Sequence, residues 1–380
     1  MRSDASGSVF HRGDPSVGMA TRSATWDYRE AFGDRFARTY FRRFGEGVVS
    51  SIGLGTYLGD PTDAADDAYH DAIVEALESG VNLVDTAINY RHQRSERVVG
   101  RALADADVDR EAVVVATKGG FVPFEGERPA DRGRWIHEEY VDTGIVEADD
   151  LVRGQHCITP GYVDDQLDRS LANLGLDTVD CYYVHNPETQ LAGRSREAVY
   201  DLLEATFARL EERAAAGDIR HYGVATWEAF RVPADHEKYL SLTEVVSRAR
   251  AAAKTAGNAA THFRAVQLPF NAVMADAFTV EAQEGADGSQ SALWFAHEAG
   301  LDVFASASLA QGRLLKGLPG AVAEQVAGET STQRAINFAR SAPGVTSALV
   351  GTGSPDHVAE NVAAGTHPPL GADAFDSIFQ

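Results

Sequence analysis

Four side chains with complementary chemistry lie at or just after short apolar segments of the chain. Asp85 lies in VNLVDTA, Lys118 in AVVVATKGG and His185 in TVDCYYVHN, while Tyr90 follows Asp85 by five residues. A phenol is a weak acid with a pKa near 10, and a neighbouring ammonium group favours the phenolate and lowers that pKa. An aspartate would hold the ammonium in place, and a histidine would donate a hydrogen bond to a carbonyl oxygen. These groups together suit protonation of a carbonyl oxygen while a hydride reaches its carbon.

Each of these residues also has a plainer explanation when it is taken alone. An aspartate at a strand end is often a capping group, a lone tyrosine is often a surface aromatic, and a histidine is often a hydrogen-bonded core residue. Lys118 carries more weight because the chain has only four lysines, and arginine cannot supply a compact ammonium group. Their occurrence in order, at the ends of successive strands, favours a shared catalytic site.

The elements that must position these residues alternate between β-like and helical patterns from about residue 48. The predicted strands are 48–57, 81–87, 112–120, 178–186, 219–226, 265–271, 301–308 and 346–353. The predicted helices are 63–80, 95–106, 162–175, 196–218, 241–257, 290–300, 330–344 and 354–365. This alternation predicts a (β/α)8 TIM barrel, in which loops that follow strands form the catalytic face. A doubly wound sheet is the alternative, but no G-x-G-x-x-G turn follows the first strand.

The predicted barrel has an N-terminal extension and a long insertion after strand 3. Residues 1–45 are predicted to be an arm whose aromatic residues dock on the rest of the chain, and residues 46–380 are predicted to be one domain. The insertion, 119–159, is longer than most loops, and such loops are often functional lids; a packing flap is the alternative. Phe121, Phe124 and Trp135 are its candidate apolar walls for a substrate. A smaller insertion is expected around 228–241.

The composition excludes several other classes of protein. There are 56 acidic residues against 34 basic ones, for a net charge of −22, so a nucleic-acid backbone would be repelled. An acid-rich, lysine-poor chain resembles proteins of extreme halophiles, although an ordinary acidic protein is the alternative. No segment has the apolar length of a membrane helix, and no apolar segment follows Met1, so we expect a cytoplasmic protein without a membrane partner. Cys157 and Cys181 have no disulfide or zinc spacing, and no metal is expected.

The motifs as a set resemble the aldo-keto reductase superfamily over residues 48–365. They are GLGTYLG, VDTAINY, SERVVGRAL, VATKGG, LGLDTVDCYYVHNPE, HYGVAT, VQLPFN and VGTGSPDHVAEN. The resemblance implies a barrel that binds NADP or NAD extended across its mouth, without a Rossmann motif. It also implies that Tyr90 is the acid/base, with Asp85, Lys118 and His185 completing a tetrad.

The resemblance also implies binding residues. For the cofactor these are Gly55, Thr56, Tyr57, Asp85, Thr226, Trp227, Gln267, Ser306, Ala307, Leu309, Gln311, Gly312, Gly351, Thr352, Gly353, His357, Glu360 and Asn361. For the substrate they are Tyr57, Phe121, Trp135 and His185. The chain departs from the family pattern at several of these positions.

These departures affect both ends of the cofactor. Ser306 stands where the family has an aromatic residue that stacks on the nicotinamide, and Trp227 is a candidate replacement for that surface. Gly351 and His357 stand where a lysine and an arginine grip the 2′-phosphate of NADP. The loss of two cations favours NAD, whereas the family favours NADP, so both cofactors stay open.

The function expected from these observations is an NAD(P)-dependent oxidoreductase that interconverts a carbonyl and its alcohol. Aldehydes, ketones and sugars are the expected substrates, and a homo-oligomer is possible. The alternative is a nicotinamide-binding regulatory or redox-sensing subunit of the same fold with little turnover. A metal-dependent barrel hydrolase would need more histidine or carboxylate ligands at the strand ends.

Overall fold

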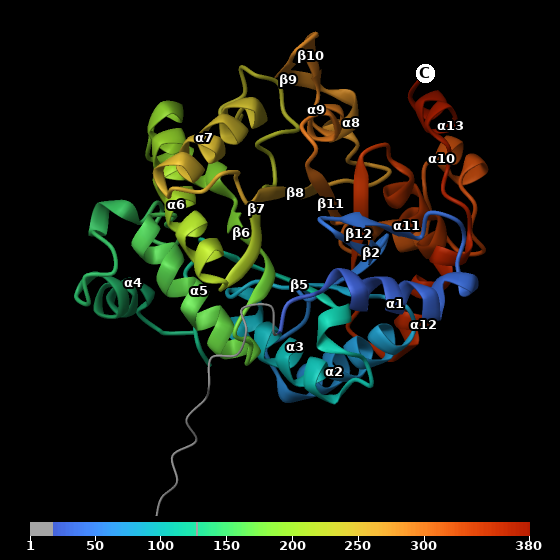
Figure 1. Cartoon of the computed structure of the whole chain (residues 1–380), viewed down its shortest axis with the longest axis horizontal. Helices are drawn as coiled ribbons and strands as arrows, with labels where there is room; N and C mark the ends of the chain where they lie inside the picture. Colours follow the sequence, from blue (N-terminus) through green and yellow to red (C-terminus); the bar gives the residue numbers. More distant parts are fainter. Residues whose placement is uncertain (1–17, 127) are drawn as a thin grey trace, which may run out of the picture.

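Eight parallel strands close into a barrel in a computed structural model that describes residues 18–126 and 128–380 (Figure 1). The order around the barrel is β11-β12-β3-β4-β5-β6-β7-β8, so neighbours in space are mostly neighbours in sequence. The strands are β3 (Ile52–Gly55), β4 (Leu83–Asp85), β5 (Val114–Gly119), β6 (Val179–His185), β7 (Ile219–Ala225), β8 (Phe263–Pro269), β11 (Asp302–Ser306) and β12 (Val345–Gly351). The predicted (β/α)8 fold is therefore confirmed.

A helix follows each barrel strand and covers its outer side. These helices are α2 (Asp63–Glu78), α3 (Arg94–Asp105), α5 (Pro160–Leu174), α6 (Arg196–Ala216), α7 (Leu242–Thr255), α9 (Ala292–Glu298), α11 (Ser331–Ser341) and α12 (Pro355–Ala363). Several begin at a side-chain cap, as α2 does at Thr62 and α6 at Ser195. Shorter helices are α4 (Arg132–Ile136), α8 (Asp276–Thr279), α10 (Gly320–Gln325) and α13 (Ala372–Asp376).

The strand register explains why the candidate residues converge. Gly55 at the end of β3 is paired with Asp85 at the end of β4, and Lys118 near the end of β5 is paired with Tyr183 of β6. His185 is the last residue of β6. Because the strands are parallel, these positions share the carboxyl end of the barrel.

The N-terminal segment covers the opposite end. Helix α1 (Arg22–Phe32) precedes a hairpin of β1 (Phe41–Phe44) and β2 (Gly47–Ser50). The predicted strand 48–57 is thus two strands, because 47–50 pair with β1 and only 52–55 enter the barrel. Phe44 packs against Phe304 inside the barrel, with ring centroids 5.5 Å apart. The first 17 residues of the predicted arm lie outside the described residues.

Two excursions leave the barrel. The insertion after β5 carries α4 and a π-helical turn, and it packs around a small core that includes its own Tyr140 and Tyr162 of α5. A second excursion, which the sequence pattern did not predict, is the hairpin of β9 (Glu281–Gly285) and β10 (Gly288–Ser291). That hairpin is why the predicted helix at 290–300 begins only at Ala292. Among the described residues, no helix combines the length and apolar character needed to cross a bilayer.

Candidate active site

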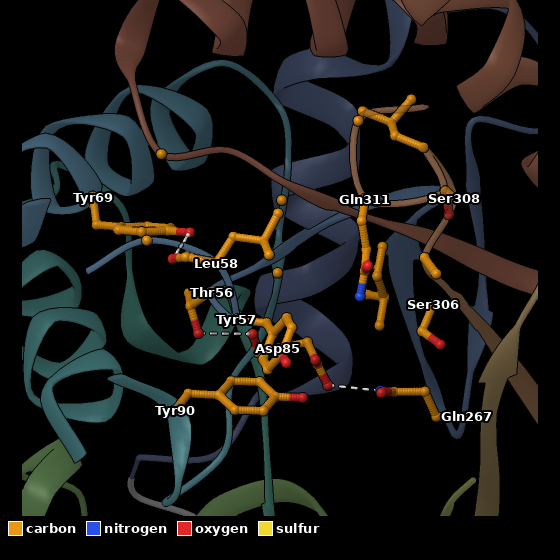
Figure 2. Close-up of a pocket in the computed structure, with 18 of the residues that line it drawn as sticks. Thr56, Tyr57, Leu58, Tyr69, Asp85, Tyr90, Gln267, Ser306, Ser308 and Gln311 are labelled. Atoms are coloured by element: carbon orange, nitrogen blue, oxygen red, sulfur yellow. Dashed lines mark hydrogen bonds between the residues drawn. The ribbon is translucent and has the colours of Figure 1, made fainter. Parts of the chain in front are cut away.

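A buried ion pair lies at the carboxyl end of β4 and β5. The ammonium Nζ of Lys118 is 2.6 Å from Oδ2 of Asp85 and donates a second hydrogen bond to the carbonyl oxygen of Thr86 at 2.8 Å. The other carboxylate oxygen of Asp85 accepts a hydrogen bond from Gln267 of β8 at 2.7 Å (Figure 2). Burial opposes the charged form of Lys118, but Asp85 and Tyr90 raise its pKa above the ordinary lysine value. Lys118 therefore keeps its positive charge in a buried site, beside the carboxylate of Asp85.

Tyr90 lies directly over this cation. Its ring centroid is 4.9 Å from Nζ of Lys118, and its ring contacts those of Tyr57 and His185 at 5.0 and 5.9 Å. Burial raises the pKa of Tyr90 above its ordinary value, while Lys118 lowers it by a smaller amount. Lys118 therefore lowers the pKa of Tyr90 as expected, but desolvation of the phenolate is the larger effect, so the net shift of the pKa is upward.

His185 is neutral. Burial, reinforced by the charge of Lys118 and by His156, lowers its pKa well below the ordinary histidine value. A neutral imidazole has one N–H donor and one acceptor nitrogen, so it can donate one hydrogen bond to a carbonyl oxygen in the cavity.

A strained turn follows Tyr90. The residues Arg91, His92 and Gln93 all have positive φ, at 47°, 56° and 67°, which costs a non-glycine residue roughly 1–2 kcal/mol each. Each side chain is tied to a different neighbour. Arg91 bonds to Asp60 and Asp66, Nδ1 of His92 lies 2.7 Å from the carbonyl oxygen of Gly126, and Gln93 accepts from Asn173. These contacts hold the turn, and with it the backbone of Tyr90.

Tyr90 opens into a cavity of about 980 Å³ that runs from His185 to α12. All the residues assigned to the cofactor, except Thr352, line this cavity. Among the residues assigned to the substrate, Tyr57, Phe121 and His185 line it. Figure 2 shows Tyr69 and Leu58 on one side of the cavity and Ser308 and Gln311 on the other, with Tyr90, Asp85 and Gln267 at one end. Asp85 and Glu360 are its carboxylates, and neither lysine nor arginine is found among its lining residues in the described ranges.

Three predicted residues are not among those that line the cavity. Lys118 is fully buried and reaches the site only through Asp85 and Tyr90. Thr352 is buried and accepts a hydrogen bond from Asn361 at 2.9 Å, so it supports a lining residue. Trp135 packs on Phe124 and Tyr140 within the insertion, with ring centroids 5.2 and 5.9 Å away, and is not among the lining residues.

The cavity also includes residues that the sequence reasoning missed. They are Leu58, Gly59, Ala65, Tyr69, Asn89, Asn186, Ala225, Ser308, Leu315, Thr332 and Leu349. Asn89 and Asn186 are adjacent in the sequence to Tyr90 and His185. This adjacency could have predicted that both asparagines line the cavity. Tyr69 lies inside α2, where a buried aromatic looks like an ordinary core residue.

The end of the cavity near α12 is built from backbone and small side chains. Gly351 and Gly353 lead into α12, whose N-cap residue Ser354 makes no capping hydrogen bond with its side chain. Backbone N–H groups at such a helix start attract anions, and phosphate groups in particular. His357 in the first turn is exposed, and Glu360 accepts a hydrogen bond from Thr330 at 2.6 Å.

Trp227 stands at the mouth on the loop after β7. The residue is 39% exposed, and its backbone N–H donates to the buried carboxylate of Glu188 at 2.7 Å. The next N–H, that of Glu228, donates to the same oxygen at 3.0 Å. Glu188 thus fixes the start of this loop, and Trp227 lines the same cavity as Thr226 and Ser306.

The sequence of the chain resembles those of known proteins. The model of the Aldo/keto reductase family matches residues 51–245. The chain is 30% identical over 204 residues to an NADH-specific methylglyoxal reductase of Escherichia coli (strain K12), covering 52% of this chain and 53% of that protein. It is 32% identical over 177 residues to 2,5-diketo-D-gluconic acid reductase B of Corynebacterium sp. (strain SHS752001), covering 46% of this chain and 45% of that protein. The chain therefore spans about half the length of the curated relatives it matches.

Solved structures resemble the whole barrel. The holo form of an aldo-keto reductase from Bacillus halodurans has a TM-score of 0.60 at 20% identity, covering 89% of this chain and 95% of that one. An aldo-keto reductase from Klebsiella pneumoniae, solved in complex with NADPH, has a TM-score of 0.58 at 20% identity, covering 89% and 93%. At this level of identity the likeness concerns the fold.

Proposed function

This chain belongs to the aldo/keto reductase family, and we propose that it is an NAD(P)-dependent oxidoreductase that interconverts a carbonyl and its alcohol by hydride transfer. The observation that carries the proposal is the arrangement of Tyr90 over the buried Lys118–Asp85 pair, 4.9 Å from the ammonium, at the wall of a large cavity. A structural ion pair alone would not need a tyrosine and a neutral histidine beside it, both opening into the same cavity.

The cavity fits an extended dinucleotide. Its volume of about 980 Å³ lies at the upper end of the range for small-molecule sites. Gln267 uses its Nε2 to hold Asp85, which leaves its Oε1 for an amide donor in the cavity. The uncapped start of α12 offers backbone N–H groups to a phosphate. When bound, the nicotinamide supplies or accepts the hydride.

The residues of this chain supply the proton and the orientation. In the reducing direction, Tyr90 donates its phenolic proton to the carbonyl oxygen, and His185 donates a hydrogen bond to the same oxygen. Lys118 stabilises the resulting phenolate, while Asp85 holds the ammonium in place. In the oxidising direction, the phenolate of Tyr90 accepts the proton of the alcohol.

The lining of the cavity favours NAD over NADP. A 2′-phosphate is usually bound by arginine or lysine, and the described lining offers His357 and Glu360 near α12 instead. The E. coli relative is named as NADH-specific, which is consistent with this choice, whereas the Klebsiella structure contains NADPH. Small neutral aldehydes, ketones or sugars fit a substrate end formed by aromatic and amide side chains such as Phe121 and Asn89.

The test follows nicotinamide absorbance in 2 M potassium chloride. NADH and NADPH are each combined with a panel of carbonyls, and NAD⁺ and NADP⁺ with a panel of sugars and alcohols. We expect turnover in the wild type and a loss of roughly 10³-fold in kcat for Tyr90→Phe, with unchanged cofactor affinity. Tyr57→Phe, which changes a neighbouring cavity tyrosine, is the matched control. Full activity of Tyr90→Phe would reject the proposed mechanism, and tight cofactor binding without turnover would favour a redox-sensing subunit.

We also propose that the acidic composition is an adaptation to high salt. The net charge of −22 includes carboxylates grouped around single arginines, as at Arg248, which contacts Glu197, Asp201, Glu204 and Glu244. Salt screens repulsion among the excess carboxylates, so the melting temperature is expected to rise between 0.1 and 2 M potassium chloride, at ionic strengths where the Debye length falls from about 10 Å to below 3 Å. A melting temperature that falls over this range would contradict the proposal.

A further inference from the structure

We propose that His156, which lies in the neck of the insertion after β5, is a positioning residue for His185. The inference rests on the proposed function, because it concerns how the carbonyl-binding imidazole is held. The neck is formed where the two ends of the insertion pair with each other. The N–H of Val122 donates to the carbonyl oxygen of Gln155, and that of Cys157 donates to Gly120, both at 2.9 Å.

His156 links the neck to the end of β6 by a hydrogen bond. Nε2 of His156 lies 2.7 Å from the backbone carbonyl oxygen of His185. Gly120 permits this approach, because a Cβ at that position would lie 2.8 Å from the same oxygen and 3.2 Å from Nε2 of His156. Gly120 also has φ of +146°, a conformation that other residues rarely adopt.

A chain of hydrogen bonds determines which nitrogen of His156 carries the proton. Arginine can only donate, so the 3.1 Å bond from Nε of Arg194 makes Oε1 of Gln190 the acceptor. The amide Nε2 of Gln190 therefore donates, and its partner at 2.8 Å is Nδ1 of His156. With Nδ1 as acceptor, the neutral ring carries its proton on Nε2 and donates it to His185. Burial lowers the pKa of His156 to about 4, which keeps the ring neutral near pH 7.

His185 depends on the hydrogen bond from His156 because the His185 ring has few contacts that hold it in place. Within the described residues its Nδ1 is buried without a hydrogen-bond partner. Its ring is otherwise placed by edge contacts with Tyr90 at 5.9 Å and Phe121 at 5.1 Å. Phe121 in turn packs on His156, with ring centroids 4.7 Å apart. His156 thus fixes both the backbone of His185 and the aromatic wall beside it.

A matched pair of substitutions separates positioning from general stability. Both His156→Gln and His156→Asn remove the ring, but glutamine places its amide nitrogen near the position of Nε2, whereas asparagine reaches only that of Nδ1. We expect His156→Gln to keep kcat within about threefold of the wild type. A displaced catalytic group costs up to roughly 10²-fold, so we expect His156→Asn to lose at least tenfold in kcat with unchanged NADH affinity. Equal kcat values for the two variants at equal melting temperatures would overturn the inference.

A second measurement uses the wild type and does not depend on turnover. Nitrogen-15 NMR of the histidine rings is expected to show His156 protonated on Nε2, with Nδ1 as acceptor. Protonation on Nδ1 would overturn the inference even if the variants failed to fold. The two proposals fail differently: a wild type that binds NADH but reduces no carbonyl rejects the proposed function, while the tautomer of His156 still decides the inference.

Discussion

The two ends of the cavity are built in different ways. At the Tyr90 end, side chains from β4, β5, β6 and β8 form a buried and charged arrangement centred on the 2.6 Å contact of Lys118 with Asp85. At the α12 end, glycines, an uncapped serine and an exposed histidine present mainly backbone groups. Side-chain identity is therefore critical where a proton must move. Backbone geometry is sufficient where an anion is only bound. Substitutions at the two ends should therefore have effects that differ in magnitude and in the property affected.

The largest effect is expected when the buried pair is broken. Lys118→Met leaves Asp85 buried without its cation, so we expect a loss of about 3–5 kcal/mol in unfolding free energy. We also expect a loss of roughly 10²-fold or more in kcat, because the phenolate of Tyr90 loses its stabilising charge. Chemical denaturation and steady-state kinetics measure the two effects.

Two further variants sharpen this result. Lys238 makes an ion pair of similar length, 2.7 Å, with Glu228, but both side chains are partly exposed, so Lys238→Met should cost at most about 1 kcal/mol. The double variant Lys118→Met with Asp85→Asn should recover much of the stability without recovering kcat. Equal losses of unfolding free energy in Lys118→Met and Lys238→Met would show that burial does not make one ion pair more important for stability than the other.

The pH dependence of the Tyr90 end follows from the direction of its pKa. In the proposed mechanism Tyr90 acts as an acid only while it is protonated, and burial raises its pKa above the ordinary value. We therefore expect kcat/KM for the carbonyl, at saturating NADH, to stay level up to about pH 10 and to fall above it. Alcohol oxidation, which needs the phenolate, should rise with pH over the same range. A reduction rate that falls near pH 7, with the fold intact by circular dichroism, would contradict this assignment.

At the α12 end, adding a cation should change cofactor choice without changing the chemistry. His357→Arg supplies a guanidinium to a 2′-phosphate, so the ratio of kcat/KM for NADPH to that for NADH should rise about tenfold. His297→Arg, on the exposed face of α9 and outside the cavity lining, makes the same substitution elsewhere and should leave the ratio unchanged. An equal rise in both variants would point to overall charge rather than local binding.

The smallest effect is expected at the N-cap of α12. The hydroxyl of Ser354 makes no capping bond, so Ser354→Ala should change the unfolding free energy by less than about 0.5 kcal/mol and weaken cofactor binding about threefold. Ser195→Ala is the comparison, since Ser195 accepts the N–H of Ala198 at 3.2 Å and its loss should cost about 1 kcal/mol without affecting binding. Titration by fluorescence and thermal unfolding measure both quantities.

Much of the barrel could be predicted from the alternation of patterns along the chain. Seven of the eight predicted strands overlap one barrel strand each, and the first, 48–57, divides between β2 and β3. The apolar pattern could not predict where 48–57 divides, because both β2 and β3 are apolar. Only the turn near residue 45 brings β2 into pairing with β1. The β9–β10 hairpin was missed for a related reason: its residues are mainly polar and match no strand period.

The order of Asp85, Tyr90, Lys118 and His185 along the chain was sufficient to place them at one end of the barrel, since the carboxyl ends of parallel strands meet there whatever loops connect them. The pKa values of these groups and the contacts that position them depend on the tertiary structure. Burial, which no spacing reveals, outweighs Lys118 and raises the pKa of Tyr90. The bond from His156 to the carbonyl oxygen of His185 joins residues 29 positions apart, one in the insertion and one at the end of β6. Such contacts depend on how the loops fold back on the barrel. Long-range packing determines the path of the loops, and the local sequence pattern does not.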